Sequence, residues 1–325
     1  MSLQGYVAPA WLPGGHLQTI WPALRGRRAP RDAVALRRRR IATPDGDFVD
    51  FDFAPPGRPG APLLVLLHGL EGSARSHYAQ AFALAAARRG WHFVVPHFRG
   101  CSGQINLAPR AYHSGDFQEV GWMLEQLRDA VDSPRRLAVG VSLGGNALLR
   151  WAAETGAAAA GSVQAVAAVS APLDLAAAGR AIDRGLNRQL YARWFLRTMR
   201  PRALAKWDQF PGLFDRTRVE RAVTLRAFDD AFTAPLHGFA GVDDYWARAS
   251  ARPHLRRIRI PALAVNARND PFVPATSLPT ASEVDRRVTL WQPAQGGHVG
   301  FPSGRFPDPR QPLPESVCDW LNASG

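Results

Sequence analysis

Cysteine and lysine are scarce in this chain of 325 residues. The two cysteines, Cys101 and Cys318, stand far apart, so they provide neither a disulfide framework nor a metal-binding spacing. We therefore expect a reducing compartment, the cytoplasm, and neither a metal ion nor another cofactor. Lys206 is the only lysine, and the formal net charge of +13 comes almost entirely from arginine.

Long apolar runs are missing as well. No uninterrupted stretch approaches the ~20 residues that span a bilayer, and the first residues lack the basic and apolar segments of a secretory signal. We expect no transmembrane segment, while contact with a membrane surface stays open. The positive charge is accompanied by no nucleic-acid-binding motif, so we expect no nucleic acid as a partner.

The chain is organised around residues 137–149, LAVGVSLGGNALL. Within this stretch, residues 140–144 fit the pattern G-x-S-x-G, between an apolar strand-like run and a run that suits a helix. A serine on so sharp a turn is a nucleophile elbow, where Gly140 and Gly144 let strand and helix approach closely. An ordinary glycine-rich turn has the same residues, but the position between strand and helix favours Ser142 as a nucleophile.

Apolar runs and helical segments alternate along much of the chain. This alternation indicates an α/β fold with a mostly parallel, doubly wound sheet. The predicted strands are residues 63–67, 91–96, 137–141, 163–169, 258–267 and 288–291, and the predicted helices are residues 76–89, 114–131, 146–153 and 314–321.

Two short segments near the N-terminus predict an antiparallel hairpin. Residues 48–53 alternate, with apolar side chains on one face and Asp50 and Asp52 on the other. The preceding Asp-Gly pair is a strong turn signal. The four consecutive arginines at 37–40 then form the partner strand, where two of them face the aspartates.

Composition divides the chain into three parts. Residues 1–30, rich in Pro, Gly and Trp, form an irregular arm, and residues 31–172 with 256–325 form the α/β core. Residues 173–255 interrupt the strand pattern and form a mostly helical insertion. The arm is expected to pack on the core through Trp11, Leu17, Ile20 and Trp21.

The insertion repeats apolar residues every four positions, with arginines between them. We interpret it as a cap with an apolar lining over the active site, because such segments supply pocket walls and exclude water. A second structural domain and a basic amphipathic surface for lipid headgroups are the alternatives. The repeat consists of Ile182, Leu186, Leu190 and Trp194.

A nucleophile elbow requires an acid and then a histidine later in the chain. Of the histidines that follow Ser142, His298 alone lies beyond the last apolar runs, in a Gly-Gly-His turn, and we predict that it is the general base. For the acid we prefer Asp270, which closely follows the predicted strand 258–267. Asp174, after the strand 163–169, is the alternative.

Two backbone N–H groups are expected to form an oxyanion hole. One belongs to Leu143, directly after the serine, and the other to Leu70, in the loop that follows residues 63–67. His68 in this loop precedes the serine, and we interpret it as a residue that holds the loop by hydrogen bonds. His16 is likewise interpreted as a structural histidine of the arm.

With these elements placed, the chain resembles the α/β-hydrolase superfamily, and within it the YheT-type hydrolases, which are related to eukaryotic abhydrolase-domain esterases and lipases. The resemblance covers nearly the whole chain. It implies hydrolysis of carboxylic esters by a triad that maps onto Ser142, Asp270 and His298. The motifs that carry it are PAWLPGGHLQTIWP (9–22), HGLEGS (68–73), HFRGCSG (97–103), GVSLGGN (140–146), FDDAFTAPLHGF (228–239), NARNDPF (266–272) and GGHVGF (296–301).

The sequence therefore predicts a serine hydrolase that cleaves a small-molecule acyl ester through an acyl-enzyme. Three alternatives stay open. One is an acyltransferase or thioesterase with the same triad, and another is a lipid-directed acylglycerol lipase or phospholipase. The third is a non-catalytic binding module on the same fold.

Overall fold

The computed structural model describes residues 3–25, 33–306 and 312–324. In these residues, eight strands form one sheet in the order β1-β2-β4-β3-β5-β6-β7-β8. The first hairpin joins the sheet antiparallel, and β3 to β8 run parallel. This confirms the predicted α/β fold. The strands are β1 (Arg37–Ala42), β2 (Phe48–Phe53), β3 (Leu63–Leu67), β4 (His92–Pro96), β5 (Arg136–Val141), β6 (Ala165–Val169), β7 (Ala262–Val265) and β8 (Val288–Trp291).

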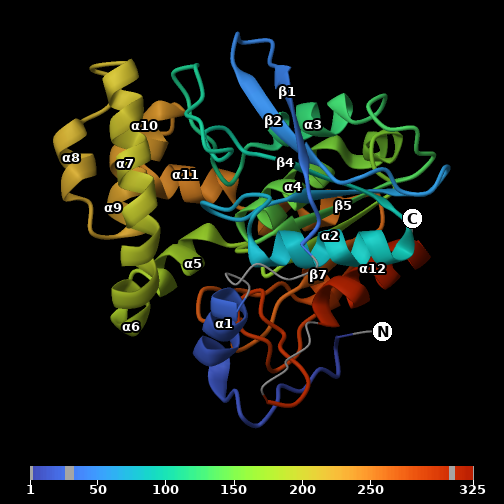
Figure 1. The fold of residues 1–325 in the computed structure, drawn as a ribbon. Coiled ribbons are helices and arrows are strands. Elements are labelled where there is room, and N and C mark those ends of the chain that lie inside the picture. Colours follow the sequence, from blue (N-terminus) through green and yellow to red (C-terminus); the bar gives the residue numbers. More distant parts are fainter. Residues whose placement is uncertain (1–2, 26–32, 307–311, 325) are drawn as a thin grey trace.

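Helices cover both faces of the sheet (Figure 1). On one face lie α2 (His77–Arg89) and α12 (Pro312–Ser324), and on the other α3 (Phe117–Gln126) and α4 (Leu143–Thr155). Because side chains alternate along a strand, β3 contributes to both apolar layers. Its whole length is buried, as expected for a central parallel strand.

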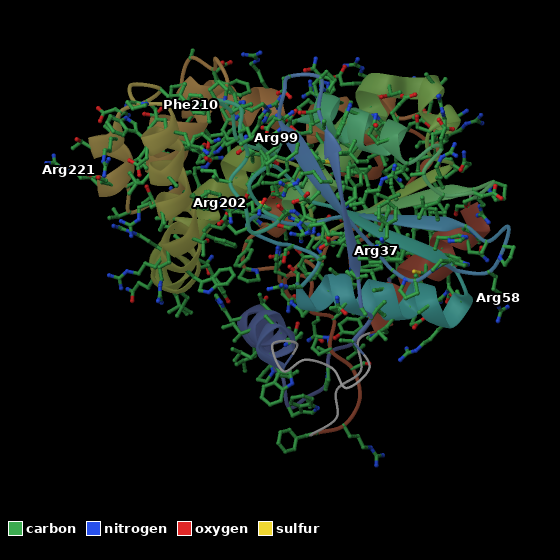
Figure 2. All side chains as sticks on the ribbon, turned by 45° about the horizontal axis from the view of Figure 1, so that its top comes forward. Arg37, Arg58, Arg99, Arg202, Phe210 and Arg221 are labelled. Carbon is green, nitrogen blue, oxygen red and sulfur yellow. The ribbon has the colours of Figure 1, made fainter. Side chains whose placement is uncertain are left out.

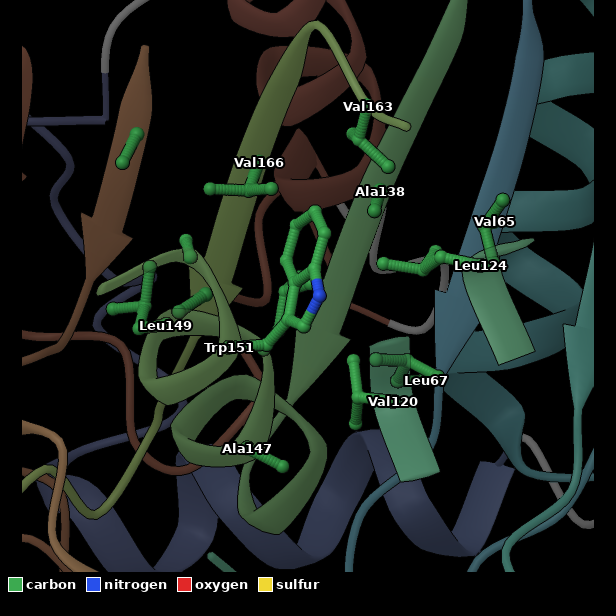
Figure 3. Close-up of a cluster of buried hydrophobic side chains, with 14 of the residues drawn as sticks. Val65, Leu67, Val120, Leu124, Ala138, Ala147, Leu149, Trp151, Val163 and Val166 are labelled. Carbon is green, nitrogen blue, oxygen red and sulfur yellow. The ribbon is translucent and has the colours of Figure 1, made fainter. Parts of the chain in front are cut away.

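The layer under α3 and α4 positions the strand-to-helix turn at Ser142. Trp151 of α4 lies among side chains of β3, β5, β6 and α3, including Leu124 and Val166 (Figure 3). It is buried, and its truncation to alanine is expected to cost about 3–5 kcal/mol of stability. This packing holds α4 firmly behind β5.

The predicted hairpin is confirmed, including the pairing of its arginines with its aspartates. Arg38 is opposite Asp52 in the ladder and Arg40 is opposite Asp50. Each guanidinium donates two hydrogen bonds to its carboxylate, with N···O distances of 2.8–2.9 Å. The aspartates are buried, so these arginines neutralise charge within the sheet.

Between β6 and β7 the chain forms a succession of helices, called here the helical insertion (residues 173–255), which gathers beside the sheet on the left of Figure 1. Its longest run joins α6, the π-helical turn η2 and α7 end to end. The helices are α5 (Leu175–Ile182), α6 (Gly185–Asn187), η2 (Arg188–Ala192), α7 (Arg193–Gln209), α8 (Arg216–Arg221), α9 (Leu225–Phe228), η3 (Asp229–Thr233), α10 (Ala234–Leu236), α11 (Val242–Ala249) and η4 (Arg252–Arg257), which ends just beyond the insertion.

The N-terminal segment differs from the sequence prediction. Twelve residues of the predicted irregular arm form the helix α1 (Gly14–Arg25), and residues 1–2 and 26–30 lie outside the described residues. Leu17, predicted to pack on the core, is exposed, whereas Gln18 and Thr19 are buried. The prediction was wrong for Leu17, because α1 docks on loops whose backbone groups need polar partners, but Ile20 packs against the buried cluster that contains Tyr191 and Phe272.

Two predicted elements are shorter than expected, for identifiable reasons. The helix expected at 114–131 begins at Phe117, because the Asp116 side chain accepts a hydrogen bond from the Glu119 N–H and caps it. The strand expected at 258–267 is only Ala262–Val265, since Pro261 just before it has no N–H for the ladder. Within the described ranges, no helix combines the length and the apolar content needed to cross a bilayer.

Candidate active site

Ser142 lies on the turn between β5 and α4, with φ of 53° and ψ of −118°, a conformation that is strained for any residue with a side chain. The flanking glycines are required by close approach. A Cβ at Gly140 would lie 2.4 Å from the Gly144 carbonyl oxygen, and one at Gly144 would lie 2.5 Å from the His68 carbonyl oxygen. The turn therefore has the geometry of a nucleophile elbow.

The three side chains predicted as a triad lie in one hydrogen-bonded chain. His298 Nε2 is 3.1 Å from Ser142 Oγ, and His298 Nδ1 is 2.8 Å from Asp270 Oδ2. The Asp270 side chain is fully buried, and that of His298 is 10 % exposed. Because a carboxylate accepts at Nδ1, that nitrogen carries the proton and Nε2 is left to accept from the serine hydroxyl.

The two carboxylates considered as the acid have different surroundings. Asp270 contacts His298, and its second oxygen accepts hydrogen bonds from the N–H groups of Phe272 and Val273. Asp174 instead caps α5, where its side chain accepts from the Ala177 N–H at 2.9 Å. The structure thus brings Asp270, not Asp174, to the imidazole.

The loop after β3 is held in place by two tyrosines. The Gly69 N–H donates to the Tyr78 hydroxyl at 2.9 Å, and the Glu71 N–H donates to the Tyr112 hydroxyl at 3.0 Å. His68 bonds to the Gly69 carbonyl through Nδ1 and accepts the Phe98 N–H through Nε2. Burial lowers the pKa of His68 to about 3, so this histidine is neutral and structural, as its interpretation from sequence required.

The N–H of Leu70 lies between the two that the tyrosines occupy. Among the described residues, neither this N–H nor that of Leu143 has an acceptor. Both residues line the pocket that contains Ser142. Leu143 is also the first residue of α4, where N–H groups point out of the helix and favour negative charge. The two groups are therefore available to an oxyanion.

Glu71 ties the same loop to the helical insertion. Its φ of 56° is unusual for a residue with a side chain. Its Oε1 accepts hydrogen bonds from the Tyr112 hydroxyl at 2.8 Å and from Arg202 Nη1 at 2.9 Å. Arg202 comes from α7 (Figure 2), so a helix of the insertion is connected to the loop that carries Leu70.

Two residues of α1 that the sequence analysis missed hold the histidine loop. Thr19 Oγ1 accepts the His298 N–H at 2.8 Å. Gln18 Oε1 accepts both the Gly296 N–H and the Asn269 amide at 2.9 Å. Both residues lie in the motif PAWLPGGHLQTIWP, which supported the family resemblance and was the signal that could have pointed to them. His16 of α1 has a structural partner, the Tyr191 hydroxyl at 3.0 Å from its Nδ1.

Ser142 and His298 lie where two cavities meet. The outer cleft, about 510 Å³, lies between α1, the loop after β3 and the η2–α7 run. The inner pocket, about 100 Å³, lies under the insertion and is mostly apolar. The residues that line the inner pocket include Leu175, Ile182, Phe195, Met199, Leu225 and Trp246.

The four-residue apolar repeat of the insertion is divided between several surroundings. Ile182 lines the inner pocket, whereas Leu190 and Trp194 line the outer cleft. Leu186 is 56 % exposed. Ile182 ends α5, whereas the other three residues lie on the α6–η2–α7 run, so the repeat does not form one face of one helix. Phe195, which lies outside the repeat, lines both cavities.

One carboxyl group lies in the wall of the inner pocket. Asp229 accepts hydrogen bonds from Trp246 Nε1 at 2.9 Å and from the Thr233 hydroxyl at 2.8 Å. Burial raises the pKa of Asp229 to about 6. No group of three or more His, Cys, Asp or Glu side chains in the described part of the chain is placed to hold a metal ion.

A mostly parallel sheet with a serine elbow and an apposed histidine and carboxylate defines the α/β hydrolase class. The family model for the alpha/beta hydrolase fold matches residues 62–304. The chain belongs to this family.

Several proteins of known name are similar over most of their length. YheT of Escherichia coli (strain K12), whose name gives it a provisional esterase assignment, is 37% identical over 310 residues, which cover 94% of this chain and 89% of that protein. Human phospholipase ABHD3 is 27% identical over 310 residues, 93% of this chain and 75% of that protein. Mouse monoacylglycerol lipase ABHD2 is 26% identical over 340 residues, which cover 98% of this chain and 80% of that protein.

Solved structures show the same fold at lower identity. The Pyrococcus furiosus esterase Pf2001 has a TM-score of 0.58 at 16% identity and covers 90% of this chain and 92% of its own. The mouse alpha/beta hydrolase domain-containing protein 10 has a TM-score of 0.55 at 15% identity and covers 89% of this chain and 100% of its own. At these identities the likeness concerns the fold alone.

Proposed function

We propose that this protein is a serine hydrolase that cleaves carboxylic esters through an acyl-enzyme. The observation that carries the proposal is the chain of contacts from Ser142 Oγ through His298 to the buried carboxylate of Asp270, at 3.1 and 2.8 Å. The esterase name of the YheT relative points the same way.

In the proposed first half-reaction, Ser142 Oγ attacks the ester carbonyl while His298 Nε2 takes the hydroxyl proton. The negative charge that develops on the carbonyl oxygen is accepted by the N–H groups of Leu70 and Leu143. His298 then returns the proton to the leaving alcohol as the carbon–oxygen bond breaks. Asp270 keeps the imidazole oriented and stabilises its positive charge.

In the second half-reaction, water attacks the acyl-enzyme. His298 takes a proton from the water and gives it to Ser142 Oγ as the acid leaves, so the enzyme returns to its starting state. We assign the acyl group to the inner pocket, because its apolar wall suits a hydrocarbon chain. The alcohol part then lies in the outer cleft, which opens to the surface.

A lipid ester is the second candidate substrate. The apolar linings of both cavities suit a fatty acyl group, and the names of ABHD3 and ABHD2 are those of a phospholipase and a monoacylglycerol lipase. For the compartment we propose the cytoplasm, because Cys101 and Cys318 are both free thiols in the folded chain.

The test is turnover of p-nitrophenyl esters from acetate to palmitate by the wild-type protein and by Ser142→Ala. Removal of the nucleophile should lower kcat by roughly 10³-fold or more, because the members of a triad act as a unit. Ser162→Ala is the matched control, since Ser162 precedes β6 and lies at the opposite end of the parallel strands from Ser142. Near wild-type turnover by a folded Ser142→Ala protein contradicts the mechanism, and transfer to an added alcohol in place of hydrolysis identifies an acyltransferase.

A further inference from the structure

The mouth of the outer cleft has exposed apolar side chains on both sides. Leu24 of α1 is 54 % exposed, and Leu190 and Trp194 of the insertion are 44 % and 46 % exposed, and all three line the cleft. Leu186, four residues before Leu190, is exposed as well. Figure 1 shows α1 and α6 at the same end of the molecule. Single exposed apolar residues are ordinary, but these surround one opening.

Beside this rim, the same helical run carries a basic groove. Arg188, Arg193, Arg197 and Arg200 line a groove of about 840 Å³. Residues 184–207 include these four and three further cationic residues, and no acidic residue. Asp183 directly before this stretch interacts with Arg188, and Asp208 directly after it forms an ion pair with Arg216.

Arginines elsewhere in the insertion are placed differently. Arg218 forms an ion pair with Asp230, and Arg226 forms one with Asp243. Among the described residues, Arg193 and Arg197 form no such pair with a carboxylate. The charges of Arg193 and Arg197 are therefore available to an external anion.

We propose that this end of the molecule docks on an anionic lipid bilayer. The docking surface consists of the apolar rim (Leu24, Leu186, Leu190 and Trp194) and the arginine groove (Arg188, Arg193, Arg197 and Arg200). Leucine and tryptophan side chains insert at the boundary between headgroups and acyl chains, and arginines bind lipid phosphates. An apolar rim beside an arginine-lined groove supplies both chemical parts of such a surface.

Other occupants fit less well. A second copy of the chain would bring two basic grooves together in a protein with a net charge of +13. A free polyanion would contact the groove but leave the rim exposed. A bilayer also explains why the rim surrounds the outer cleft, because docking would place the mouth of this cleft against the lipid. Phe195, next to Trp194 on the same helix, lines the inner pocket. This last consequence rests on the proposed ester hydrolysis, whereas docking itself does not.

The experiment measures co-sedimentation of the Ser142→Ala protein with phosphatidylcholine vesicles that contain or lack phosphatidylglycerol. We expect binding to the vesicles with phosphatidylglycerol and release by salt. Arg193→Gln and Arg197→Gln should each weaken binding about fivefold, the factor that corresponds to one cation near an anionic membrane. Leu186→Ser, at a position that lines neither cavity, should weaken it about tenfold. Arg58→Gln is the matched control, because Arg58 is exposed at the far side of the molecule (Figure 2) and should bind like the parent protein.

Three results would overturn docking: equal weakening by Arg58→Gln and Arg193→Gln, unchanged binding of Leu186→Ser, or no binding to anionic vesicles. Circular dichroism and turnover of p-nitrophenyl acetate, measured with Ser142 restored, show whether Arg193→Gln, Arg197→Gln and Leu186→Ser are folded. Vesicle binding by a protein that hydrolyses no ester would disprove the proposed function and leave docking supported. Ester hydrolysis without vesicle binding would disprove docking and leave the proposed function supported.

Discussion

The helix α1 and the helical insertion flank the catalytic histidine proposed here and contact the site in different ways. The helix α1 uses directional hydrogen bonds, which Gln18 and Thr19 accept from backbone N–H groups of the loop that carries His298. The insertion uses apolar side chains such as Phe195 and Met199, which line the inner pocket. Hydrogen bonds fix one geometry, whereas an apolar lining accepts any chain that fills it. We therefore expect α1 to act mainly on the rate of the chemistry and the apolar side chains of the insertion mainly on the choice of acyl chain.

The largest effect should come from the acid on the α1 side. Asp270→Asn is expected to lower kcat by about 10⁴-fold, the cost of the corresponding change in the serine protease template, because the imidazole loses its orientation and charge partner. Asp174→Asn, at the start of the insertion, should have little effect, since asparagine also caps helices well. Turnover of p-nitrophenyl acetate measures both. A damaging Asp174→Asn with a mild Asp270→Asn would reverse this assignment.

The next largest loss of activity should come from a substitution in α1. Thr19→Val keeps the shape of the side chain but leaves the His298 N–H without its acceptor, so the imidazole can shift. We expect kcat to fall roughly 10- to 100-fold for every ester, with the ratios between esters unchanged. Thr198→Val, at an exposed threonine of α7, is the control. A change in chain-length preference in Thr19→Val would contradict the division of roles between α1 and the insertion.

One polar contact of the insertion should also affect the chemistry. Arg202→Met removes a donor to Glu71 and leaves a buried carboxylate with one partner fewer, next to Leu70 in the proposed oxyanion hole. We expect kcat to fall about tenfold with little change in KM, and Arg202→Lys to recover part of the loss. Arg221→Met is the control, since Arg221 lies at the outer edge of the insertion (Figure 2). A rise in KM at constant kcat would show that Arg202 contacts the substrate instead.

The inner pocket should determine chain-length preference. Phe195→Ala enlarges it, and each additional buried methylene is worth ~0.8 kcal/mol, about fourfold in kcat/KM. Turnover of the p-nitrophenyl ester series should therefore shift toward longer acyl groups while acetate changes little. Trp194→Ala, which opens the outer cleft alone, should shift the series less. Equal shifts in the two variants would place the acyl group in the outer cleft.

The smallest effect concerns Asp229 and pH. Its folded-state pKa of about 6 lies above the ordinary 3.8, so the folded chain disfavours the ionised form. The contribution of Asp229 to the free energy of unfolding should therefore fall as the pH rises from 3.8 to about 6 and stay level above that. Asp229→Asn should remove this contribution, which lowers the free energy of unfolding by on the order of 1–3 kcal/mol between pH 3.8 and about 6. Urea unfolding of both proteins at the two pH values checks it, and parallel pH curves would contradict it.

Much of the sheet and the central site could be predicted from sequence, because their signals are local. Apolar runs, the G-x-S-x-G pattern and the order of acid and histidine led to Ser142, Asp270 and His298, which the structure brings into contact. The hairpin charges were also predictable, since opposed arginines and aspartates follow from strand alternation.

The contribution of α1 could not be predicted in the same way. Its paired glycines and Pro22 indicate irregular structure, and its buried face is polar, so neither propensity nor periodicity reveals the helix. The partners of Gln18 and Thr19 lie more than 250 residues later in the chain, and only the tertiary fold brings them together. In the insertion, the repeat indicated an apolar helix but not which side of it would face the pocket.

The most direct test of this account is the rate at which a small fluorophosphonate modifies Ser142, followed by mass spectrometry of the labelled peptide. The reagent reports activation of the nucleophile and needs no acyl pocket. We predict labelling at Ser142 in the wild-type protein, labelling of Thr19→Val slowed by the same factor as its kcat, and an unchanged rate in Phe195→Ala. Labelling at another residue, or equal slowing in the two variants, would contradict the division of roles between α1 and the insertion.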